Sequence, residues 1–373
     1  MPGIYIHIPF CKQKCTYCDF HFSTTFSTYR KEMIDAILQE IELRKGYLKE
    51  PIGTIYFGGG TPSLLTEKEQ VAILNKITAC FETLDAVEVT LEANPDDIEQ
   101  RSLSAWKNAG INRLSIGLQS FKAADLEWMN RAHTVEEANQ CISLAQKAGF
   151  NNLTVDLIYG LPDLTLDEWK NHIQQLIDQD VPHISAYCLT VEKKTVLANW
   201  VLKGKIKMAS EDVQSEQFLT LLELLEANNY EQYEISNFCK KGFESKHNSN
   251  YWKGEHYIGI GPSAHSFNGT SRSWNVANNT LYIKAIKNGL SFSEKEELSD
   301  ENRFNELLLT GLRTKYGVNL DNLKKIVALT KQFNDAKKSF VNKNWMEERE
   351  NTLFLTKEGK LMADFIASEL FID

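Results

Sequence analysis

The sequence lacks any long uninterrupted run of apolar residues. Hydrophobic residues make up 42% of the 373 positions, but no stretch reaches the roughly 18 apolar residues that a membrane-spanning helix needs. The apolar segment at the start of the chain is too short for a secretory signal, and no basic residue precedes it. We therefore expect a cytoplasmic protein without a transmembrane segment.

The chain is also short of positive charge. It has 41 lysine and arginine residues against 50 aspartate and glutamate residues, which gives a formal net charge of −9. A surface of this sign repels phosphate backbones over most of its area. Nucleic acid is therefore not an expected partner, although a local basic patch is compatible with this composition.

Cysteine is scarce, and the number of cysteines is odd. Seven cysteines without an export signal do not fit a disulfide framework in a chain of this size. Cys80 and Cys141 fall in helix-like apolar patterns and Cys188 in a strand-like one, where small buried side chains are expected. No role is assigned to Cys239. The other three cysteines lie close together near the start of the chain.

Short apolar runs alternate with longer segments of helical periodicity in the first half of the chain. The expected strands are Ile4–Ile8, Thr54–Phe57, Val87–Leu91, Arg113–Leu118, Leu153–Ile158 and Ile184–Leu189. The expected helices include Tyr29–Leu43, Val71–Phe81 and Val135–Ala148. Capping boxes of the form Thr-x-x-Glu occur at Thr66/Glu69, Thr134/Glu137 and Thr165/Glu168. Six strand–helix units predict an α/β fold, a partial (β/α)6 barrel, with a doubly wound open sheet as the alternative.

The pattern changes after about residue 200, where a helical run at Val213–Ala227 leads into the Tyr- and Asn-rich stretch Tyr230–Asn279. We expect loops and short strands there. A small, mainly helical and winged-helix-like unit follows, with elements at Phe304–Leu312, Leu320–Val327, Thr352–Thr356 and Gly359–Phe371. The predicted domains are a barrel over residues 1–230, a connecting region that closes it over residues 231–299, and a C-terminal helical domain over residues 300–373.

Three cysteines, Cys11, Cys15 and Cys18, follow the first expected strand at spacings of four and three residues. A loop with this spacing can direct three sulfurs to one metal centre. A [4Fe–4S] cluster usually takes four thiolates, so three would leave one iron with an open position. A structural zinc site is the alternative, with His7 or His21 as its fourth ligand.

The C-x3-C-x2-C pattern, with Tyr17 before the third cysteine, resembles the signature of the radical S-adenosylmethionine superfamily. The resemblance implies a [4Fe–4S] cluster whose fourth iron binds the methionine part of S-adenosylmethionine. Within such a family the cofactors carry the radical chemistry, and the protein supplies orientation and a dry pocket.

Polar groups recur where the expected parallel strands end, at the face where barrel chemistry sits. Gly58-Gly-Gly-Thr-Pro62 follows one strand, Glu92 and Gln119 close two others, and Asp156 lies inside a very apolar strand. A carboxylate in such a strand is costly unless it is paired or bound. On chemistry alone, Asp156 suits ribose hydroxyls, Glu92 an ammonium and Arg131 a carboxylate.

The likeness extends to one branch of the superfamily, the branch of oxygen-independent coproporphyrinogen III oxidases and heme chaperones. It is carried by Tyr5–Cys11, Gly58–Pro62, Ser115–Phe121, Asp156–Pro162 and Leu355–Gly359, and so covers nearly the whole chain. The resemblance implies that S-adenosylmethionine is contacted by Tyr5, Tyr17, Gly59, Gly60, Thr61, Glu92, Gln119, Arg131 and Asp156. Asp19 and Phe20 are expected to shape the same pocket.

Three features resemble the chaperones rather than the oxidases. Phe20 stands where the oxidases carry a further cysteine, the first strand starts at about Gly3 without their N-terminal extension, and His247–Trp252 matches the chaperones' H-N-x-x-Y-W motif. Neutral imidazole is a good heme ligand. From the residues alone, the preferred interpretation makes His247 a polar loop residue and places Tyr251 and Trp252 in the core that closes the barrel. The resemblance favours His247 as the heme ligand, ahead of His256 and His265.

The expected function is therefore that of a heme chaperone, with heme, a [4Fe–4S] cluster and S-adenosylmethionine as its cofactors. It would deliver heme to apo-hemoproteins such as membrane respiratory enzymes, and self-association as a homodimer is compatible with this role. Whether the chain is also an enzyme is left open by the sequence. The alternative function is oxygen-independent decarboxylation of coproporphyrinogen III.

Overall fold

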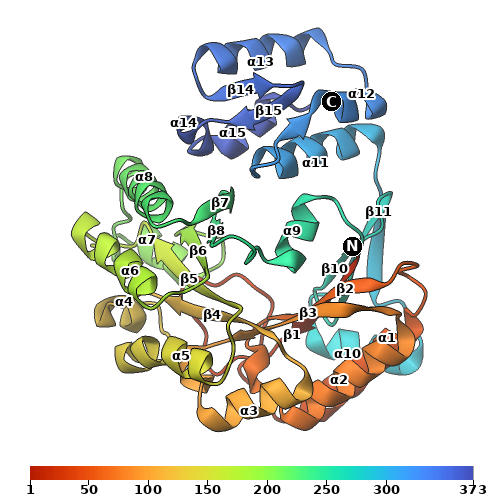
Figure 1. Cartoon of the computed structure of the whole chain (residues 1–373). Helices are drawn as coiled ribbons and strands as arrows, with labels where there is room; N and C mark the ends of the chain where they lie inside the picture. The colour runs from red at the N-terminus through yellow and green to blue at the C-terminus, as the bar shows by residue number, and fades with distance from the viewer. Residues whose placement is uncertain (373) are drawn as a thin grey trace.

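A curved sheet of twelve strands forms the centre of the molecule in a computed structural model that describes residues 1–372. The strands are ordered β12-β11-β10-β9-β1-β2-β3-β4-β5-β6-β8-β7. Figure 1 shows that the sheet bends around a concave side and does not close on itself. It is therefore an open, partial barrel.

Seven neighbouring strands in the middle of the sheet are parallel. They are β9 (Tyr257–Ile260), β1 (Gly3–Ile8), β2 (Ile52–Gly59), β3 (Thr83–Ala93), β4 (Arg113–Gln119), β5 (Leu153–Tyr159) and β6 (His183–Cys188). From β1 to β6 the order in space follows the order in the chain, as in a barrel. All six strands expected from the sequence are present, each shifted by a few residues at most at either end.

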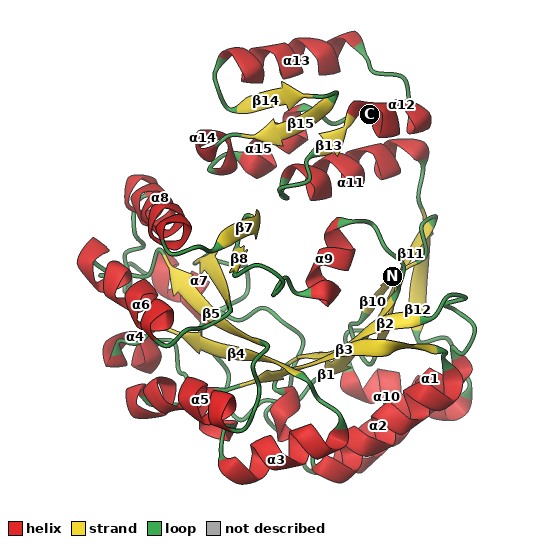
Figure 2. Ribbon diagram, in the orientation of Figure 1, coloured by secondary structure: helices red, strands yellow, loops and turns green. Residues whose placement is uncertain are grey.

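Helices between these strands cover the convex side of the sheet (Figure 2). They are α1 (Arg30–Leu43), α2 (Glu67–Cys80), α3 (Gln100–Ala109), α4 (Ala123–Trp128), α5 (Val135–Lys147), α6 (Leu166–Asp178), α7 (Val196–Leu202) and α8 (Glu211–Ala227), with short 3-10 turns at Pro62–Leu64 and Pro95–Asp97. The three predicted capping boxes are confirmed at the starts of α2, α5 and α6. A doubly wound sheet carries such helices on both faces, so that alternative is wrong.

Antiparallel strands flank the parallel set on both sides. They are β7 (Glu231–Glu234) and β8 (Asn237–Cys239) beside β6, and β10 (His265–Phe267), β11 (Ser271–Asn275) and β12 (Ser293–Glu297) beside β9. Helix α10 (Asn279–Asn288) packs against α1. The buried carboxylate of Glu40 in α1 fixes this extension, because it accepts hydrogen bonds from Gly261 N, Asn275 Nδ2 and Tyr282 Oη at 2.5 to 2.8 Å.

Helix α9 (Lys246–Trp252) lies on the concave side of the sheet, between β2 and the C-terminal unit (Figure 1). The sequence predicted loops and short strands here, and that prediction is wrong for this segment. Ser245 caps the helix through Asn248 N, and the buried Glu88 of β3 accepts hydrogen bonds from Lys246 N and His247 N at 3.3 and 3.1 Å. Tertiary contacts, rather than an apolar stripe, therefore hold this short polar helix.

The C-terminal unit has its own hydrophobic core. It contains α11 (Asp300–Leu312), β13 (Val318–Asn319), α12 (Leu320–Ile326), α13 (Lys331–Asn342), β14 (Met346–Arg349), β15 (Thr352–Leu355), α14 (Lys357–Lys360) and α15 (Ala363–Glu369). The single helix predicted over Gly359–Phe371 is wrong, because the chain breaks between α14 and α15. Arg313 of this unit pairs with the buried Glu234 of β7 at 2.8 Å and so ties it to the sheet.

The helices, strands and three-stranded sheet of this unit agree with the winged-helix-like arrangement expected from the sequence. The exact domain boundaries stay a prediction. Within residues 1–372, no helix has both the length and the apolar character needed to cross a membrane.

Candidate functional site

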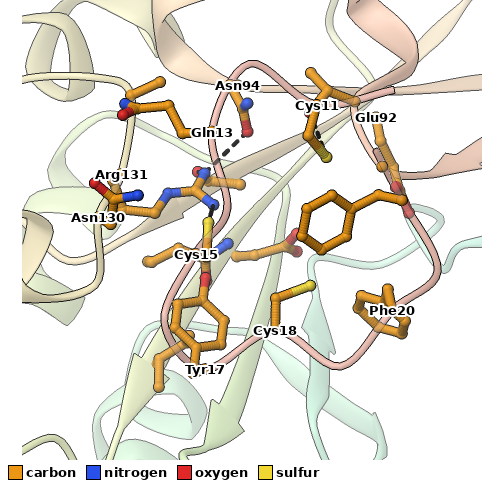
Figure 3. A pocket seen from close by; sticks show the side chains of 18 of the residues that line it. Cys11, Gln13, Cys15, Tyr17, Cys18, Phe20, Glu92, Asn94, Asn130 and Arg131 are labelled. Atoms are coloured by element: carbon orange, nitrogen blue, oxygen red, sulfur yellow. Dashed lines mark hydrogen bonds between the residues drawn. The ribbon is translucent and has the colours of Figure 1, made fainter. Parts of the chain in front are cut away.

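The loop of residues 11–18 leaves the end of β1 and is anchored at both of its ends. The backbone N–H of Cys11 donates to the carbonyl of Ser23 at 3.1 Å, and that of Thr16 donates to Met129 at 3.1 Å. Figure 3 shows the side chains of Cys11, Cys15 and Cys18 on this loop around one pocket. The loop is therefore held in place by its neighbours while its sulfurs face open space.

All three sulfurs line a cavity of about 400 Å³ at the ends of the parallel strands. None of these cysteines is in a disulfide, and each is half-buried. Burial raises the pKa of the Cys11 thiol to about 11 and that of Cys18 to about 12. Desolvation disfavours a thiolate here in the absence of a cation, so the loop suits a positive metal centre that would keep the thiols ionised.

The zinc alternative needs a histidine next to the three thiols, and both candidates make hydrogen bonds to other groups. His7 Nε2 donates to the carbonyl of His21 at 2.8 Å, and Tyr5 Oη contacts His7 Nδ1 at 3.2 Å. His21 Nε2 bonds Asn279 Oδ1 at 2.7 Å. Among residues 1–372, no three His, Cys, Asp or Glu side chains are gathered as a single-ion site. The geometry therefore does not support a mononuclear zinc site.

The turn after β2 brings backbone very close to the cysteine loop. Gly60 N donates to Ile8 O at 2.8 Å, and Thr61 N donates to Phe10 O at 2.6 Å. A Cβ at Gly60 would lie 2.6 Å from the Phe10 carbonyl and 3.0 Å from Cys11 Sγ. Gly59 has a φ of +107°, which favours glycine. The glycine run is thus required by a close approach, and it leaves room beside the sulfurs.

Two carboxyl groups face the cavity from different strands. Glu92 of β3 accepts hydrogen bonds from Tyr56 Oη at 2.9 Å and Gly59 N at 3.2 Å. Burial raises the pKa of Glu92 to about 7 and that of Asp156 in β5 to about 7 as well. Such shifts mark positions where a cationic or hydroxyl-bearing ligand gains most from a carboxylate.

Arg131 bridges the cysteine loop and the strand ends. Its guanidinium donates to Asn94 Oδ1 at 2.9 Å, to Gly117 O at 2.6 Å and to Cys15 Sγ at 3.4 Å (Figure 3). Its buried Nε finds no acceptor in residues 1–372. Gln119 ends β4 with a φ of +72°, which turns its side chain beside Arg131 and Gly117. The guanidinium therefore lines the cavity with one buried donor that has no partner.

Most of the predicted site residues meet at this cavity. Besides the cysteines, its lining includes Tyr17, Asp19, Phe20, Gly59, Gly60, Thr61, Glu92, Gln119, Arg131 and Asp156. Tyr5 does not line the cavity and lies behind it, where its ring stacks on Tyr56. The structure thus places eight of the nine predicted nucleotide contacts around one space, while their roles stay predictions.

The sequence did not single out several other residues of the lining. They are Asn94, Ser115, Asn130, Tyr187, Cys188 and Thr190, among others. Two of them could have been found from the sequence. Asn94 directly follows a strand, as the predicted polar site residues do, and Asn130 is the residue before Arg131. Tyr187 and Cys188 carry no such signal, because an apolar strand pattern does not reveal which side chains face a cavity.

The predicted heme ligand, His247, does not line this cavity. It lies on α9 at the starts of the strands, with its side chain almost fully buried. Its Nδ1 bonds Thr54 Oγ1 and its Nε2 bonds Tyr251 Oη, both at 2.8 Å. Burial lowers its pKa to about 3. In this conformation both ring nitrogens are engaged, so neither is open to an iron.

The two weaker candidates are on the outer part of the sheet. His256 and His265 are both exposed; His256 packs edge-on against Phe267, and His265 lies beside Trp274. Neither lines the cavity with the cysteines.

Comparison with known proteins assigns the family. Residues 5–176 match the model of the radical SAM superfamily. The heme chaperone HemW of Bacillus subtilis (strain 168) is 35% identical over 98% of this chain and 97% of its own length. HemW of Lactococcus lactis subsp. lactis is 31% identical over 99% of this chain and 97% of its own length. The chain belongs to the HemW family.

HemW of Escherichia coli (strain K12) is 36% identical over 70% of this chain and 69% of its own length. The solved coproporphyrinogen III oxidase HemN of Escherichia coli is 19% identical and covers 99% of this chain and 90% of its own, with a TM-score of 0.85. This match confirms the α/β radical SAM fold. HemW proteins are thus 31 to 35% identical to this chain over nearly its full length, whereas the 19% identity to HemN supports the shared fold alone.

Proposed function

We propose that the chain holds a [4Fe–4S] cluster on Cys11, Cys15 and Cys18, binds S-adenosylmethionine beside it, and serves as a heme chaperone. The observation that carries the proposal is the match to relatives called heme chaperone HemW over nearly the full length of both chains. A loop with three free thiols at a cavity lined by Glu92 and Arg131 supports the cofactor part.

The residues of the cavity fit these cofactors. Three thiolates leave one of four irons without a protein ligand, and the Cβ-free turn at Gly59 and Gly60 leaves room next to it. When bound, a cluster with S-adenosylmethionine supplies one-electron chemistry. Glu92 would hold an ammonium, and the Arg131 guanidinium would pair with a carboxylate.

Asp156 is the proposed partner of the ribose hydroxyls. Burial keeps a large part of its carboxyl protonated near neutral pH, because its pKa is raised to about 7. A diol that donates hydrogen bonds would favour the ionised form. This group, Glu92 and Arg131 come from three different elements, so together they can orient one extended ligand.

For heme, His247 remains the proposed ligand, and its use requires a change at α9. The ring would have to leave Thr54 and Tyr251 before either nitrogen could meet iron. Apo-hemoproteins, including membrane respiratory enzymes, are the proposed acceptors, and a homodimer is the proposed assembly during transfer.

The test is a heme titration of the anaerobically reconstituted chain, followed by absorbance, with His247→Ala and His256→Ala in parallel. We expect a saturable band in the wild type, its loss in His247→Ala and its retention in His256→Ala. Mixing the loaded chain with apomyoglobin should then move the band to myoglobin. Absence of a saturable band in the wild type contradicts the chaperone proposal.

The same preparation separates the chaperone from the oxidase. With coproporphyrinogen III and S-adenosylmethionine under reducing conditions, we expect no loss of carbon dioxide by mass spectrometry. The position after Asp19, where the oxidases are expected to carry a further cysteine, holds Phe20 with 68% of its side chain exposed. Two decarboxylations per molecule would overturn the proposal in favour of the oxidase.

A further inference from the structure

Tyr56 of β2 lies directly behind the cavity and has not been assigned a role. Its hydroxyl donates to Glu92 Oε1 at 2.9 Å, and its side chain is only 7% exposed. The other oxygen of Glu92 accepts from Gly59 N at 3.2 Å. Since no other donor to this carboxylate is found in residues 1–372, Tyr56 and Gly59 together set the orientation of Glu92.

The ring of Tyr56 belongs to a ring layer of three neighbouring rings. The centroid of Tyr5 lies 6.1 Å from that of Tyr56, and the centroid of His247 lies 5.0 Å from it with an interplanar angle of 24°. Tyr5 and His247 also contact each other, with centroids 6.5 Å apart. His247 cannot shift freely, because Thr54 and Tyr251 bond its two nitrogens. Stacked aromatic rings prefer a narrow range of offsets, so this layer fixes where the Tyr56 hydroxyl points.

Helix α9 itself is anchored on both sides. The Glu88 carboxylate accepts hydrogen bonds from the first two backbone amides of the helix. At the other end of the helix, the Trp252 ring lies 5.2 Å from the Arg313 guanidinium. Arg313 belongs to the C-terminal unit and pairs with Glu234. His247 therefore lies on a helix that is fixed at both ends. Because its ring contacts the ring of Tyr56, the position of His247 restricts the position of Tyr56.

We propose that Tyr56 is a positioning residue for Glu92, and that His247 positions Tyr56. The segment His247–Trp252 thereby acts on the nucleotide pocket as well as on any heme. This inference rests on the proposed function, in which Glu92 holds the ammonium of S-adenosylmethionine. A positioned carboxylate binds an ammonium better than a free one, because the orientation is set before the ligand arrives.

The arrangement has a consequence for heme. If His247 leaves the ring layer to ligate iron, Tyr56 loses its stacking partner and Glu92 its fixed donor. Heme binding should then weaken S-adenosylmethionine binding, and by thermodynamic linkage the nucleotide should weaken heme binding by the same factor. The stacked rings would make the two cofactors compete without sharing a pocket.

The experiment measures dissociation constants of S-adenosylmethionine and of its deamino analogue, which lacks the ammonium, on the cluster-loaded chain at pH 8. The variants are Tyr56→Phe, which keeps the ring and loses the hydroxyl, and His247→Gln, which loses the ring. Tyr159→Phe is the matched control, since Tyr159 is also a buried tyrosine of the sheet and packs on Trp169 and Phe218, away from Glu92.

We expect Tyr56→Phe to weaken S-adenosylmethionine binding about tenfold, as is usual for loss of a hydrogen bond to a charged group. His247→Gln should weaken it about threefold. Both variants should leave the deamino analogue within about twofold of the wild type, and Tyr159→Phe should change neither ligand. A role in folding alone would weaken both ligands equally.

Three outcomes overturn the inference. They are unchanged nucleotide binding in Tyr56→Phe, equal weakening of both ligands, or unchanged nucleotide binding in a folded His247→Gln. If His247→Gln does not fold, Tyr56→Phe decides alone, because it retains the ring layer. Failure of the wild type to bind the nucleotide is a different result, which contradicts the proposed function itself.

Discussion

The two ends of the parallel strands both carry a carboxylate and a basic side chain, but these side chains line a cavity at one end and are buried in the protein at the other. Where the strands end, Glu92 and Arg131 line an open cavity. Where they start, Glu88 and His247 are buried, and the chain itself occupies the hydrogen-bonding groups that hold α9. Access to an open cavity, rather than residue type, therefore distinguishes the binding site from the structural centre in this molecule.

The same contrast decides what each proposed ligand requires of the chain. Ligands in barrels bind at the carboxyl ends of the strands, because loops there are free to vary. The opposite end is closed by α9 and the C-terminal unit. A ligand site at His247 thus requires the closed end to open, whereas the cysteine loop requires no such change.

The largest effect should come from the cysteine loop. Replacing Cys11, Cys15 and Cys18 with serine should remove nearly all iron and sulfide from the anaerobically reconstituted chain, because the thiolates are the proposed ligands. Cys188→Ser, a change of a cysteine that lines the same cavity, should retain the cluster. Iron and sulfide analysis decides the matter, and equal iron contents in the two variants would contradict the account.

A substitution at the closed end of the strands should change the free energy of unfolding and not the cofactor content. Thr54→Val keeps the shape of a fully buried side chain and removes the partner of His247 Nδ1. We expect the free energy of unfolding to fall by about 1 to 2 kcal/mol, with iron content unchanged. Urea unfolding of the cofactor-free chain measures this difference.

Thr90→Val is a matched control for that change. Thr90 is equally buried on β3, but its hydroxyl has no hydrogen-bond partner in residues 1–372. Its replacement should be neutral or stabilising, because an unpaired hydroxyl is removed. A loss in Thr90→Val as large as in Thr54→Val would show that the His247 bond contributes nothing.

A smaller effect should appear in the pH dependence. The pKa of Glu92 is raised from 4.5 to about 7 on folding, so in this range the folded chain binds a proton that the unfolded chain has lost. The free energy of unfolding of the cofactor-free chain should therefore fall as pH rises from about 4.5 to about 7. The contribution is about 1 kcal/mol, since solvent in the cavity screens the charge.

Glu92→Gln tests this dependence, with the exposed Glu67→Gln of α2 as its control. The first variant should reduce the slope between about pH 4.5 and 7 without abolishing it, because burial raises the pKa of Asp156 to about 7 as well, and the second should leave the slope unchanged. Nucleotide binding in the wild type should change in the opposite sense and strengthen as pH rises through about 7, because the ammonium requires the ionised carboxyl. If the free energy of unfolding had the same pH dependence in the wild type, Glu92→Gln and Glu67→Gln, Glu92 would not be the titrating group.

Much of the fold follows from local signals in the sequence. The capping boxes at Thr66, Thr134 and Thr165 mark helix starts through bonds within four residues, and all three are present. Apolar runs likewise identify the parallel strands, because both faces of these strands are covered. The spacing of the cysteines identifies the loop that lines the cavity.

The remaining features depend on contacts between distant segments. Helix α9 has no apolar periodicity and is held by Glu88, which lies far away in the chain. The burial of His247 depends on that same contact, so the sequence could not reveal that its nitrogens are engaged. Tyr187 and Cys188 were missed because their exposure to the cavity depends on the curvature of the sheet.

The most direct test of the central claim is the electron paramagnetic resonance spectrum of the reduced, reconstituted chain before and after addition of S-adenosylmethionine. The account predicts the signal of a reduced [4Fe–4S] cluster, with g values that shift when the nucleotide binds the iron that lacks a protein ligand. A cluster signal that S-adenosylmethionine leaves unchanged, or no cluster signal at all, would contradict it.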